Sequence, residues 1–422
     1  MLDKTSPSLP RGMRYENQLA MIEGMSLADI AREYPTPFYC YSQSAIEQKM
    51  QACLKAFEPT GAKVHFAVKA NSNINLLRLM AKAGLGADIV SGGELTRACT
   101  AGIAPADVIF SGVAKTDNEL EYAMHKGVGQ YNVESIEELH RINTIAQRLG
   151  VVIDAVLRVN PEVDAGTHQH ITTAKKGSKF GIAYSQLDSA LQTAATLSSI
   201  NVRGLAMHIG SQITSLEPYS QSIQRMLHWL EQLQAKGFAI DRIDLGGGLG
   251  VDYGNGEYLE YSDYAELIQA SFANYQVDIQ LELGRSLIAE AGILVSSVVS
   301  TKQSSPNNFV LLDAGMNDLL RPSLYQAHHP LLAASLSTSA RPETFDVVGP
   351  ICESTDCFHK NYPMLRPNTG DLMFFTVVGA YCSVLSSSYN SRTLIPELLV
   401  NGENVRVIRK AWTIDEQLKL EE

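Results

Sequence analysis

The chain has 422 residues, of which 45% are hydrophobic, so it is long enough for two packed domains and is not expected to be disordered. Its net charge of -11 argues against nucleic-acid binding, which needs a basic face, and favours an acidic cytoplasmic protein. No apolar run reaches the roughly 18 residues that cross a membrane, and the first residues lack the apolar region of a secretory signal, so we expect no membrane segment and no secretion. The six cysteines lack metal-site spacing, so we expect no metal site and reduced thiols.

Short β-rich runs alternate with helical segments between about residues 62 and 285. There are eight such runs, at 64–68, 87–90, 108–110, 130–133, 152–159, 202–209, 242–245 and 278–282. In the segment 135–150 apolar residues recur every three or four positions, which is typical of a helix, and a glycine follows this segment as a helix C-terminal cap requires. The alternation predicts an α/β fold, a (β/α)8 TIM-type barrel over residues 43–290, although the count alone leaves an open doubly wound sheet as the alternative.

The pattern changes after residue 291. Runs at 295–301, 308–312, 344–348 and 371–378 are apolar or alternate without long helices between them, and residues 398–407 are typical of a hairpin with an Asn-Gly turn. We therefore predict a second, C-terminal all-β domain of the sandwich or barrel kind at 291–422. Residues 1–42, which contain a strand-like stretch at 37–41, are predicted to join this domain.

Lys69 stands where the first predicted strand ends and a helical segment begins. Function in a barrel gathers at the C-terminal ends of the strands, and an amine in an apolar pocket there can form a Schiff base with a carbonyl compound. A surface lysine at a strand edge is the alternative. Asp88 ends the second strand, where it would lie near such a cofactor or cap the next helix.

Residues after the sixth and seventh strands are suited to a phosphorylated ring. Gly246, Gly247 and Gly248 would let backbone N–H groups approach a phosphate, although a tight turn explains a glycine run equally well, and the spacing does not fit a dinucleotide-binding motif. His208 and Ser211 follow the sixth strand, where an imidazole can stack on a ring and a hydroxyl can bind phosphate. The alternative for His208 is an ordinary core residue.

The eighth strand ends in Glu282, which is followed by Gly284 and Arg285. A carboxylate at this position can hold a protonated pyridine nitrogen, and that lets a pyridoxal ring accept electrons. The guanidinium can bind a carboxylate with two parallel hydrogen bonds. A structural pair between the glutamate and the arginine is the alternative.

The β domain offers five further candidates. Cys352 and Glu353 place a thiol, which can donate a proton, next to a carboxylate. A buried hydrophobic role is the usual fate of such a cysteine. Tyr325 and Tyr381 offer phenols, and Arg321 offers a second guanidinium.

As a set, these motifs closely resemble those of the diaminopimelate decarboxylases, which belong to the alanine-racemase-like (fold type III) pyridoxal-phosphate enzymes. The resemblance covers nearly the whole chain, and the order and spacing of the motifs are together highly specific. They lie at 67–73, 90–95, 132–135, 158–161, 208–212, 245–250, 313–319, 321–322, 352–354 and 388–392. Three positions depart from the family pattern: Leu283 stands in place of the usual proline, and Thr355 and Cys382 in place of the usual glycines, so that Cys382 adds a side chain beside Tyr381.

The resemblance implies pyridoxal 5'-phosphate as the cofactor and meso-2,6-diaminopimelate as the substrate. Cofactor roles would fall on barrel residues, with Asp88, Gly284 and Arg285 beside the cofactor, Lys69 as the Schiff base, Glu282 at the ring nitrogen, His208 on the ring, and Gly246, Gly247, Gly248 and Ser211 at the phosphate. Substrate roles would fall mainly on the β domain, with Arg285, Arg321 and Tyr325 at the distal carboxylate, Glu353 at the distal ammonium and Tyr381 near both ligands. Cys352 would be the proton donor, and it would enter the site with Glu353 from the partner subunit of a homodimer.

The implied reaction is the decarboxylation of meso-2,6-diaminopimelate to L-lysine and CO2, the last step of lysine biosynthesis. A decarboxylase of ornithine, lysine or arginine is the alternative, but two guanidiniums without their anion would be costly. A racemase is disfavoured because those enzymes prefer an arginine at the ring nitrogen. A non-catalytic pyridoxal-phosphate homeostasis protein is disfavoured because it resembles the barrel alone.

Overall fold

The computed structural model describes residues 9–163, 179–336 and 342–422, and these form two compact units. The barrel unit contains residues 50–251 and 258–286. The sheet unit contains the chain up to Lys49, the short segment 252–257, and residues 287–422.

Eight parallel strands close into a ring in the barrel unit. Strand β13 pairs with β5, and β8 pairs with β9, so the sheet has no free edge among these eight strands. The ring confirms the predicted (β/α)8 barrel and excludes the open doubly wound sheet. In ring order from the first, the strands are β5 (Lys63–Ala67), β6 (Gly86–Ile89), β7 (Val108–Phe110), β8 (Gln130–Val133), β9 (Ile153–Asn160), β11 (Ile200–Ala206), β12 (Arg242–Asp244) and β13 (Asp278–Leu283).

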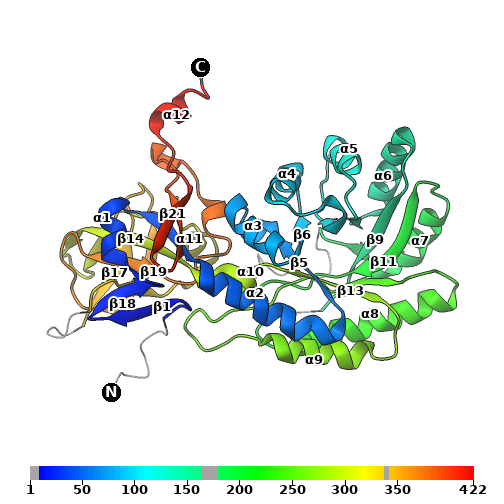
Figure 1. Ribbon diagram of the computed structural model, residues 1–422, viewed down its shortest axis with the longest axis horizontal. Coiled ribbons are helices and arrows are strands. Elements are labelled where there is room, and N and C mark those ends of the chain that lie inside the picture. Colours follow the sequence, from blue (N-terminus) through cyan, green and yellow to red (C-terminus); the bar gives the residue numbers. More distant parts are fainter. Residues whose placement is uncertain (1–8, 164–178, 337–341) are drawn as a thin grey trace. The chain divides into compact units, whose positions relative to one another are not determined.

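Helices lie outside the barrel strands (Figure 1). Helix α6 illustrates how the sequence sets their ends: the Ser135 hydroxyl accepts the backbone N–H of Glu138 at the start, and Gly150 closes the end at a φ of 66°, a backbone conformation that glycine adopts without strain. The helices of this region are α2 (Gln43–Phe57), α3 (Ile74–Lys82), α4 (Gly92–Ala101), α5 (Asp117–Lys126), α6 (Ile136–Leu149), α7 (Leu187–Ala195), α8 (Glu217–Ala235), α9 (Tyr261–Phe272) and α10 (Arg285–Ile288). Within the described ranges, none of the helices has the length and hydropathy required to cross a membrane.

The sheet unit is built mainly of antiparallel strands around β14 (Gly292–Lys302). Its large sheet has the order β18-β17-β15-β14-β4-β20-β21, and β19 pairs with both β14 and β16. The strands are β4 (Phe38–Ser42), β15 (Phe309–Leu312), β16 (Leu331–Ala333), β17 (Glu343–Val348), β18 (Cys357–Met364), β19 (Leu372–Phe375), β20 (Glu397–Asn401) and β21 (Asn404–Arg409). A second sheet joins β1 (Met13–Glu16), β2 (Leu19–Ile22) and β3 (Met25–Ser26), and the helices are α1 (Leu27–Glu33), α11 (Arg321–Tyr325) and α12 (Ile414–Leu418).

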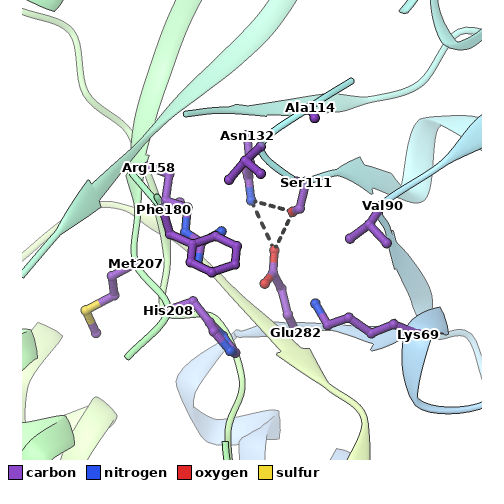
Figure 2. A pocket seen from close by; sticks show the side chains of 13 residues that line it. Lys69, Val90, Ser111, Ala114, Asn132, Arg158, Phe180, Met207, His208 and Glu282 are labelled. Carbon is purple, nitrogen blue, oxygen red and sulfur yellow. Dashed lines mark hydrogen bonds between the residues drawn. The ribbon is translucent and has the colours of Figure 1, made fainter. Parts of the chain in front are cut away.

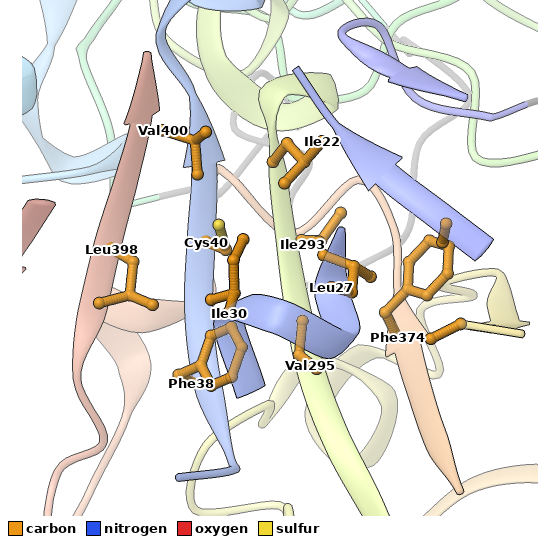
Figure 3. Close-up of a cluster of buried hydrophobic side chains, with 12 residues drawn as sticks. Ile22, Leu27, Ile30, Phe38, Cys40, Ile293, Val295, Phe374, Leu398 and Val400 are labelled. Atoms are coloured by element: carbon orange, nitrogen blue, oxygen red, sulfur yellow. The ribbon is translucent and has the colours of Figure 1, made fainter. Parts of the chain in front are cut away.

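The core of the sheet unit lies between helix α1 and the central strands (Figure 3). Leu27 and Ile30 of α1 are buried against Val295 of β14 and Phe374 of β19. The N-terminal strand β4 completes this sheet, because it pairs antiparallel with β14 and parallel with β20. The N-terminal residues therefore share a core with residues that follow the barrel in the chain.

Candidate active site

Lys69 lies at the C-terminal end of β5, in a short 3-10 turn over Val68–Ala70. Its Nζ donates to Asp88 Oδ2 at 2.8 Å, and Asp88 is fully buried. The lysine is thus an ion-pair partner rather than a solvated surface residue. Asp88 does not cap helix α4, because Ser91 accepts the backbone N–H of Glu94 in that role.

A cavity of about 420 Å³ opens beside Lys69, within the barrel unit. Its polar lining comes from strand ends and the turns that follow them, as expected for a barrel. Figure 2 shows the Lys69 side chain reaching toward Glu282 from one side, with His208 and Phe180 on the other. The polar side chains in the lining are those of Lys69, Ser111, Asn132, Arg158, His208 and Glu282.

Glu282 is a buried carboxyl group that faces this cavity. Its Oε1 accepts from Asn132 Nδ2 at 3.0 Å and from Ser111 Oγ at 3.2 Å. Burial raises the pKa of Glu282 well above its usual value, and the charges of Asp244 and Asp88 raise it further. The Glu282 carboxyl therefore favours its protonated form more than an exposed glutamate does, and it can share a proton with a basic nitrogen.

The glycine run forms a loop that lies directly against neighbouring backbone. A Cβ at Gly247 would lie 2.0 Å from the Glu282 carbonyl oxygen, so only glycine fits there. Gly246 and Gly248 have φ values of 67° and 98°, which also favour glycine. The loop is not the start of a helix, since α9 begins at Tyr261.

Ser211 and Arg285 lie next to this loop. Arg285 Nη2 donates to Ser211 Oγ at 2.9 Å. The Ser211 segment is joined to the glycine loop by two hydrogen bonds, from Ile213 N to the Gly248 oxygen and from Gly250 N to the Ile213 oxygen, each 2.9 Å long. Gly284 connects the end of β13 to α10, and so places Arg285 at the first turn of that helix.

His208 contacts the glycine loop through its ring. Its Nδ1 lies 3.3 Å from Gly247 N and accepts that N–H. Burial lowers the pKa of His208 well below its usual value, and the positive charges of Lys69 and Arg158 lower it further. The ring is therefore neutral and presents a flat surface to the cavity rather than a charge.

Four polar residues of the barrel had no predicted role. Ser111, Asn132 and Arg158 line the cavity, and Asp244 lies beneath it as a hydrogen-bond partner of Asn132. Arg158 forms a 2.7 Å ion pair with the buried Glu134. Their positions in the sequence could have indicated a role, because they lie at or near the ends of strands β7, β8, β9 and β12, where barrels carry function.

Lys115 is a second lysine close to the cavity, and its side chain is fully buried. Its Nζ donates to Glu138 Oε1 at 3.0 Å and to the carbonyl oxygens of Gly112 and Asn132 at 2.8 and 2.7 Å. This network holds the end of β8, which carries Asn132.

Lys115→Met should therefore lower the free energy of unfolding by about 3–5 kcal/mol, because it leaves the Glu138 carboxylate buried without its cation. Denaturant unfolding measures the loss. Lys236→Met is the control, since it removes an exposed lysine that pairs with Asp188 at 2.6 Å and should cost less than about 1 kcal/mol. Glu138→Gln added to Lys115→Met should recover part of the loss, and a cost no larger than that of the control would contradict the structural role.

Arg321 begins helix α11 in the sheet unit and is only 6% exposed. Its Nη1 lies 2.9 Å from the Tyr253 hydroxyl and 3.0 Å from His329 Nε2, and its guanidinium lies over the Tyr253 ring, 5.3 Å from the centroid. No carboxylate among the residues the structure describes forms an ion pair with Arg321. The arginine is thus a buried cation held by neutral groups. Tyr325 ends the same helix.

Cys352 and Glu353 are exposed on a loop whose backbone is held by hydrogen bonds to side chains. Asp356 accepts the backbone N–H groups of Ile351 and Met316 at 2.6 and 2.7 Å. Asn390 Oδ1 accepts Cys352 N at 2.9 Å, and the Tyr389 hydroxyl donates to Glu353. Tyr381 lies in another turn of this unit, with a φ of 59°.

Comparison with known proteins assigns the family. The model of the pyridoxal-dependent decarboxylase pyridoxal-binding domain matches residues 43–292. The diaminopimelate decarboxylase of Zymomonas mobilis is 41% identical over 96% of this chain and 97% of its own, and that of Pseudomonas aeruginosa is 42% identical over 95% and 96%. The chain belongs to the diaminopimelate decarboxylase family. The solved structure of diaminopimelate decarboxylase from Helicobacter pylori complexed with L-lysine matches with a TM-score of 0.90, at 38% identity, over 93% of this chain and 98% of that one.

The enzyme is accordingly a pyridoxal-phosphate-dependent decarboxylase, and the barrel fits this cofactor. A loop that admits only glycine can approach a phosphate closely, a buried carboxyl can serve a ring nitrogen, and an amine lies at the same cavity. A neutral imidazole on the cavity wall completes a set suited to a flat, phosphorylated, basic ring.

Proposed function

We propose that the enzyme decarboxylates meso-2,6-diaminopimelate to L-lysine and CO2, the last step of lysine biosynthesis. The observation that carries this proposal is the buried Arg321. A guanidinium removed from water is costly without an anion, and its hydrogen-bond partners here, Tyr253, His329 and Cys382, include no carboxylate. A substrate with a second carboxylate supplies the missing charge, whereas ornithine, lysine and arginine do not.

We assign the cofactor to the cavity of the barrel unit. When bound, pyridoxal phosphate accepts the electron pair left at Cα by the departing CO2. Lys69 would hold its aldehyde carbon, with Asp88 orienting the amine, and Glu282 would keep the ring nitrogen protonated. The remaining residues would fix its position, with His208 against the ring, Gly246, Gly247, Gly248 and Ser211 at the phosphate, and Gly284 and Arg285 beside the cofactor.

We assign substrate contacts to five residues. Arg321, Tyr325 and Arg285 would bind the distal carboxylate, and Glu353 would bind the distal ammonium, because each offers the opposite charge or a hydrogen bond. Tyr381 would contact substrate and cofactor. Cys352 would give Cα the proton that replaces the carboxylate.

Cys352 and Glu353 are exposed, and the proposal assigns them to the active site of a partner subunit in a homodimer. It also assigns residues 43–290 to the cofactor-binding domain, and residues 1–42 with 291–422 to the domain that carries the partner's groups. We also propose the cytoplasm as the location of the enzyme, because its six cysteines are free and reduced thiols are typical of that compartment.

CO2 release from meso-2,6-diaminopimelate, with and without added pyridoxal phosphate, tests the function. Turnover should require the cofactor and should exceed that of L-ornithine, L-lysine and L-arginine. Faster turnover of L-ornithine would favour the alternative, a decarboxylase of another basic amino acid. Cofactor binding without any CO2 release would favour a homeostasis protein.

A further inference from the structure

Asp244 is a buried carboxylate that the proposed reaction does not use. It ends β12 and is fully buried. Its Oδ1 accepts the backbone N–H of Gly246 at 2.9 Å, and its Oδ2 accepts from Asn132 Nδ2 at 3.0 Å. One side chain therefore joins the glycine loop to the polar floor of the cavity.

Asn132 connects Asp244 to Glu282. Its Nδ2 lies 3.0 Å from Asp244 Oδ2 and 3.0 Å from Glu282 Oε1. Gln130 Nε2 donates to Asn132 Oδ1 at 2.9 Å, which fixes the direction of the Asn132 amide. Ser111 completes the network on the side seen in Figure 2. The two carboxyl groups thus share one amide donor.

Two buried carboxyl groups this close together hold one proton between them, because ionising both is costly. Burial raises the pKa of both Asp244 and Glu282. Both carboxyls accept from Asn132, but Asp244 alone also accepts a backbone N–H, from Gly246. A hydrogen bond between the two carboxyls lowers the pKa of Asp244 and raises that of Glu282. The shared proton accordingly lies on Glu282, with Asp244 ionised.

We propose that Asp244 is a positioning residue that acts through Glu282: its charge keeps a proton on the Glu282 carboxyl, and Glu282 passes that proton to the ring nitrogen of the cofactor as it binds. An O–H bond of Glu282 breaks and an N–H bond forms. The site changes from one carboxylate and a neutral ring to two carboxylates and a cationic ring, so its net charge is unchanged. The inference rests on the proposed role of Glu282.

The other titratable groups around the pair do not exchange a proton with it. Lys69 and Asp88 form their own ion pair, as do Arg158 and Glu134. His65, next to Glu282 on strand β5, is neutral because burial lowers its pKa to about 4, and burial also keeps His208 neutral. Tyr264 of helix α9 stays protonated because burial raises its pKa.

The unfolding of the cofactor-free full-length protein as a function of pH tests the pair. A carboxyl whose pKa is raised by folding contributes stability that is full below its unfolded pKa and is lost as pH rises through its folded pKa. Asp244→Asn keeps the size of the side chain and removes its charge, which lowers the pKa of Glu282. The variant should therefore lose less stability than the wild type between about pH 5 and pH 8.

The control for this measurement is Asp346→Asn. Asp346 is also buried and also accepts one backbone N–H and one asparagine Nδ2, each at 2.8 Å, but it belongs to the sheet unit. The Asp346→Asn variant should therefore show the same pH dependence of stability as the wild type. Glu94, whose pKa burial raises to about 7, titrates in the same range and contributes equally to all three proteins, so it cancels in the comparison.

Cofactor affinity provides the second readout. In Asp244→Asn the ring nitrogen must take its proton from solvent rather than from Glu282. The dissociation constant of pyridoxal 5'-phosphate should therefore rise by about tenfold at pH 8, the equivalent of one pKa unit. It should rise by less at pH 6, where solvent supplies protons more readily. Asp346→Asn should bind the cofactor as the wild type does.

Infrared spectra of the wild type decide the question if Asp244→Asn does not fold. A protonated-carboxyl band that shifts with 13C-labelled glutamate and disappears on cofactor binding is expected in the cofactor-free protein. Absence of that band at neutral pH, or equal pH dependence in Asp244→Asn and wild type, would overturn the inference. CO2 release by the wild type is a separate measurement, so a failure of the proposed function would be seen independently.

Discussion

Lys69→Ala should reduce CO2 release from meso-2,6-diaminopimelate by about 1,000-fold or more, since it removes the amine that holds the cofactor. The absorbance of lysine-linked pyridoxal phosphate should also be absent. A primary amine such as methylamine should restore a small part of the turnover, because it replaces the missing group. Lys236→Ala is the control, since it removes a lysine from another ion pair with an aspartate, on the surface.

Borohydride reduction of the wild type, followed by peptide mapping, identifies the modified lysine directly. The adduct should be found on Lys69. Lys115 is the informative competitor, because it is buried beside Gly112 and Ala114 of the cavity lining. An adduct on Lys115, or normal turnover by Lys69→Ala, would remove the basis of the assignment.

A mixture of two inactive variants extends this test to the homodimer. Lys69→Ala and Cys352→Ala should each be nearly inactive alone. If each site takes Lys69 from one subunit and Cys352 from the other, subunit exchange creates dimers with one intact site, and part of the activity returns. No recovery on mixing, with exchange demonstrated by a mass label, would place both residues in one subunit.

The barrel could be predicted because its strands are buried on both faces. Parallel strands of this kind are short continuous apolar runs, and all eight predicted runs are strands of the ring. The three-stranded sheet at Met13–Ser26 was not predicted, because strands of two to four residues are too short to show an alternation. The grouping of residues 252–257 with the sheet unit depends on contacts such as that of Tyr253 with Arg321, which are distant in the chain.

The residues of the cavity were predicted in part. Lys69, His208 and Glu282 carry chemistry by residue type, and the structure brings them to one cavity. Asn132 and Asp244 were missed because an amide or a carboxylate near a strand end is equally typical of a cap or a turn. Their role depends on hydrogen bonds between strands separated by more than a hundred residues, and no local pattern encodes these.

Arg321→Met should lower kcat/KM for meso-2,6-diaminopimelate by about 100- to 1,000-fold, the factor that corresponds to losing a buried charge pair of about 3–4 kcal/mol. The physical reason is the burial of the guanidinium among neutral groups, which makes it a site for an anion. L-Ornithine and L-lysine lack the distal carboxylate, so their slow turnover should stay the same or rise. The ratio of the two kcat/KM values is the measurement.

Arg366→Met is the matched control for this change. Arg366 also lies over an aromatic ring, 5.6 Å from the centroid of Phe345, and it also belongs to the sheet unit. It is paired with Glu343 at 2.6 Å, however, and so has no charge to offer a substrate. This variant should leave both kcat/KM values within about twofold of the wild type, as expected for an exposed ion pair.

Tyr253→Phe separates the charge of Arg321 from its orientation. The ring stays under the guanidinium and one hydrogen bond is lost, so kcat/KM for diaminopimelate should fall by about tenfold, as for a single hydrogen bond to a charged group. His329 constrains the other side, since its Nε2 must accept from Arg321 while Nδ1 donates to the Thr376 oxygen at 3.2 Å. A protonated His329 would lose that acceptor and repel the arginine. If Arg321→Met and Tyr253→Phe each lowered kcat/KM for diaminopimelate and for ornithine by equal factors, Arg321 would support the fold rather than bind the substrate. The second carboxylate of the substrate would then need another partner.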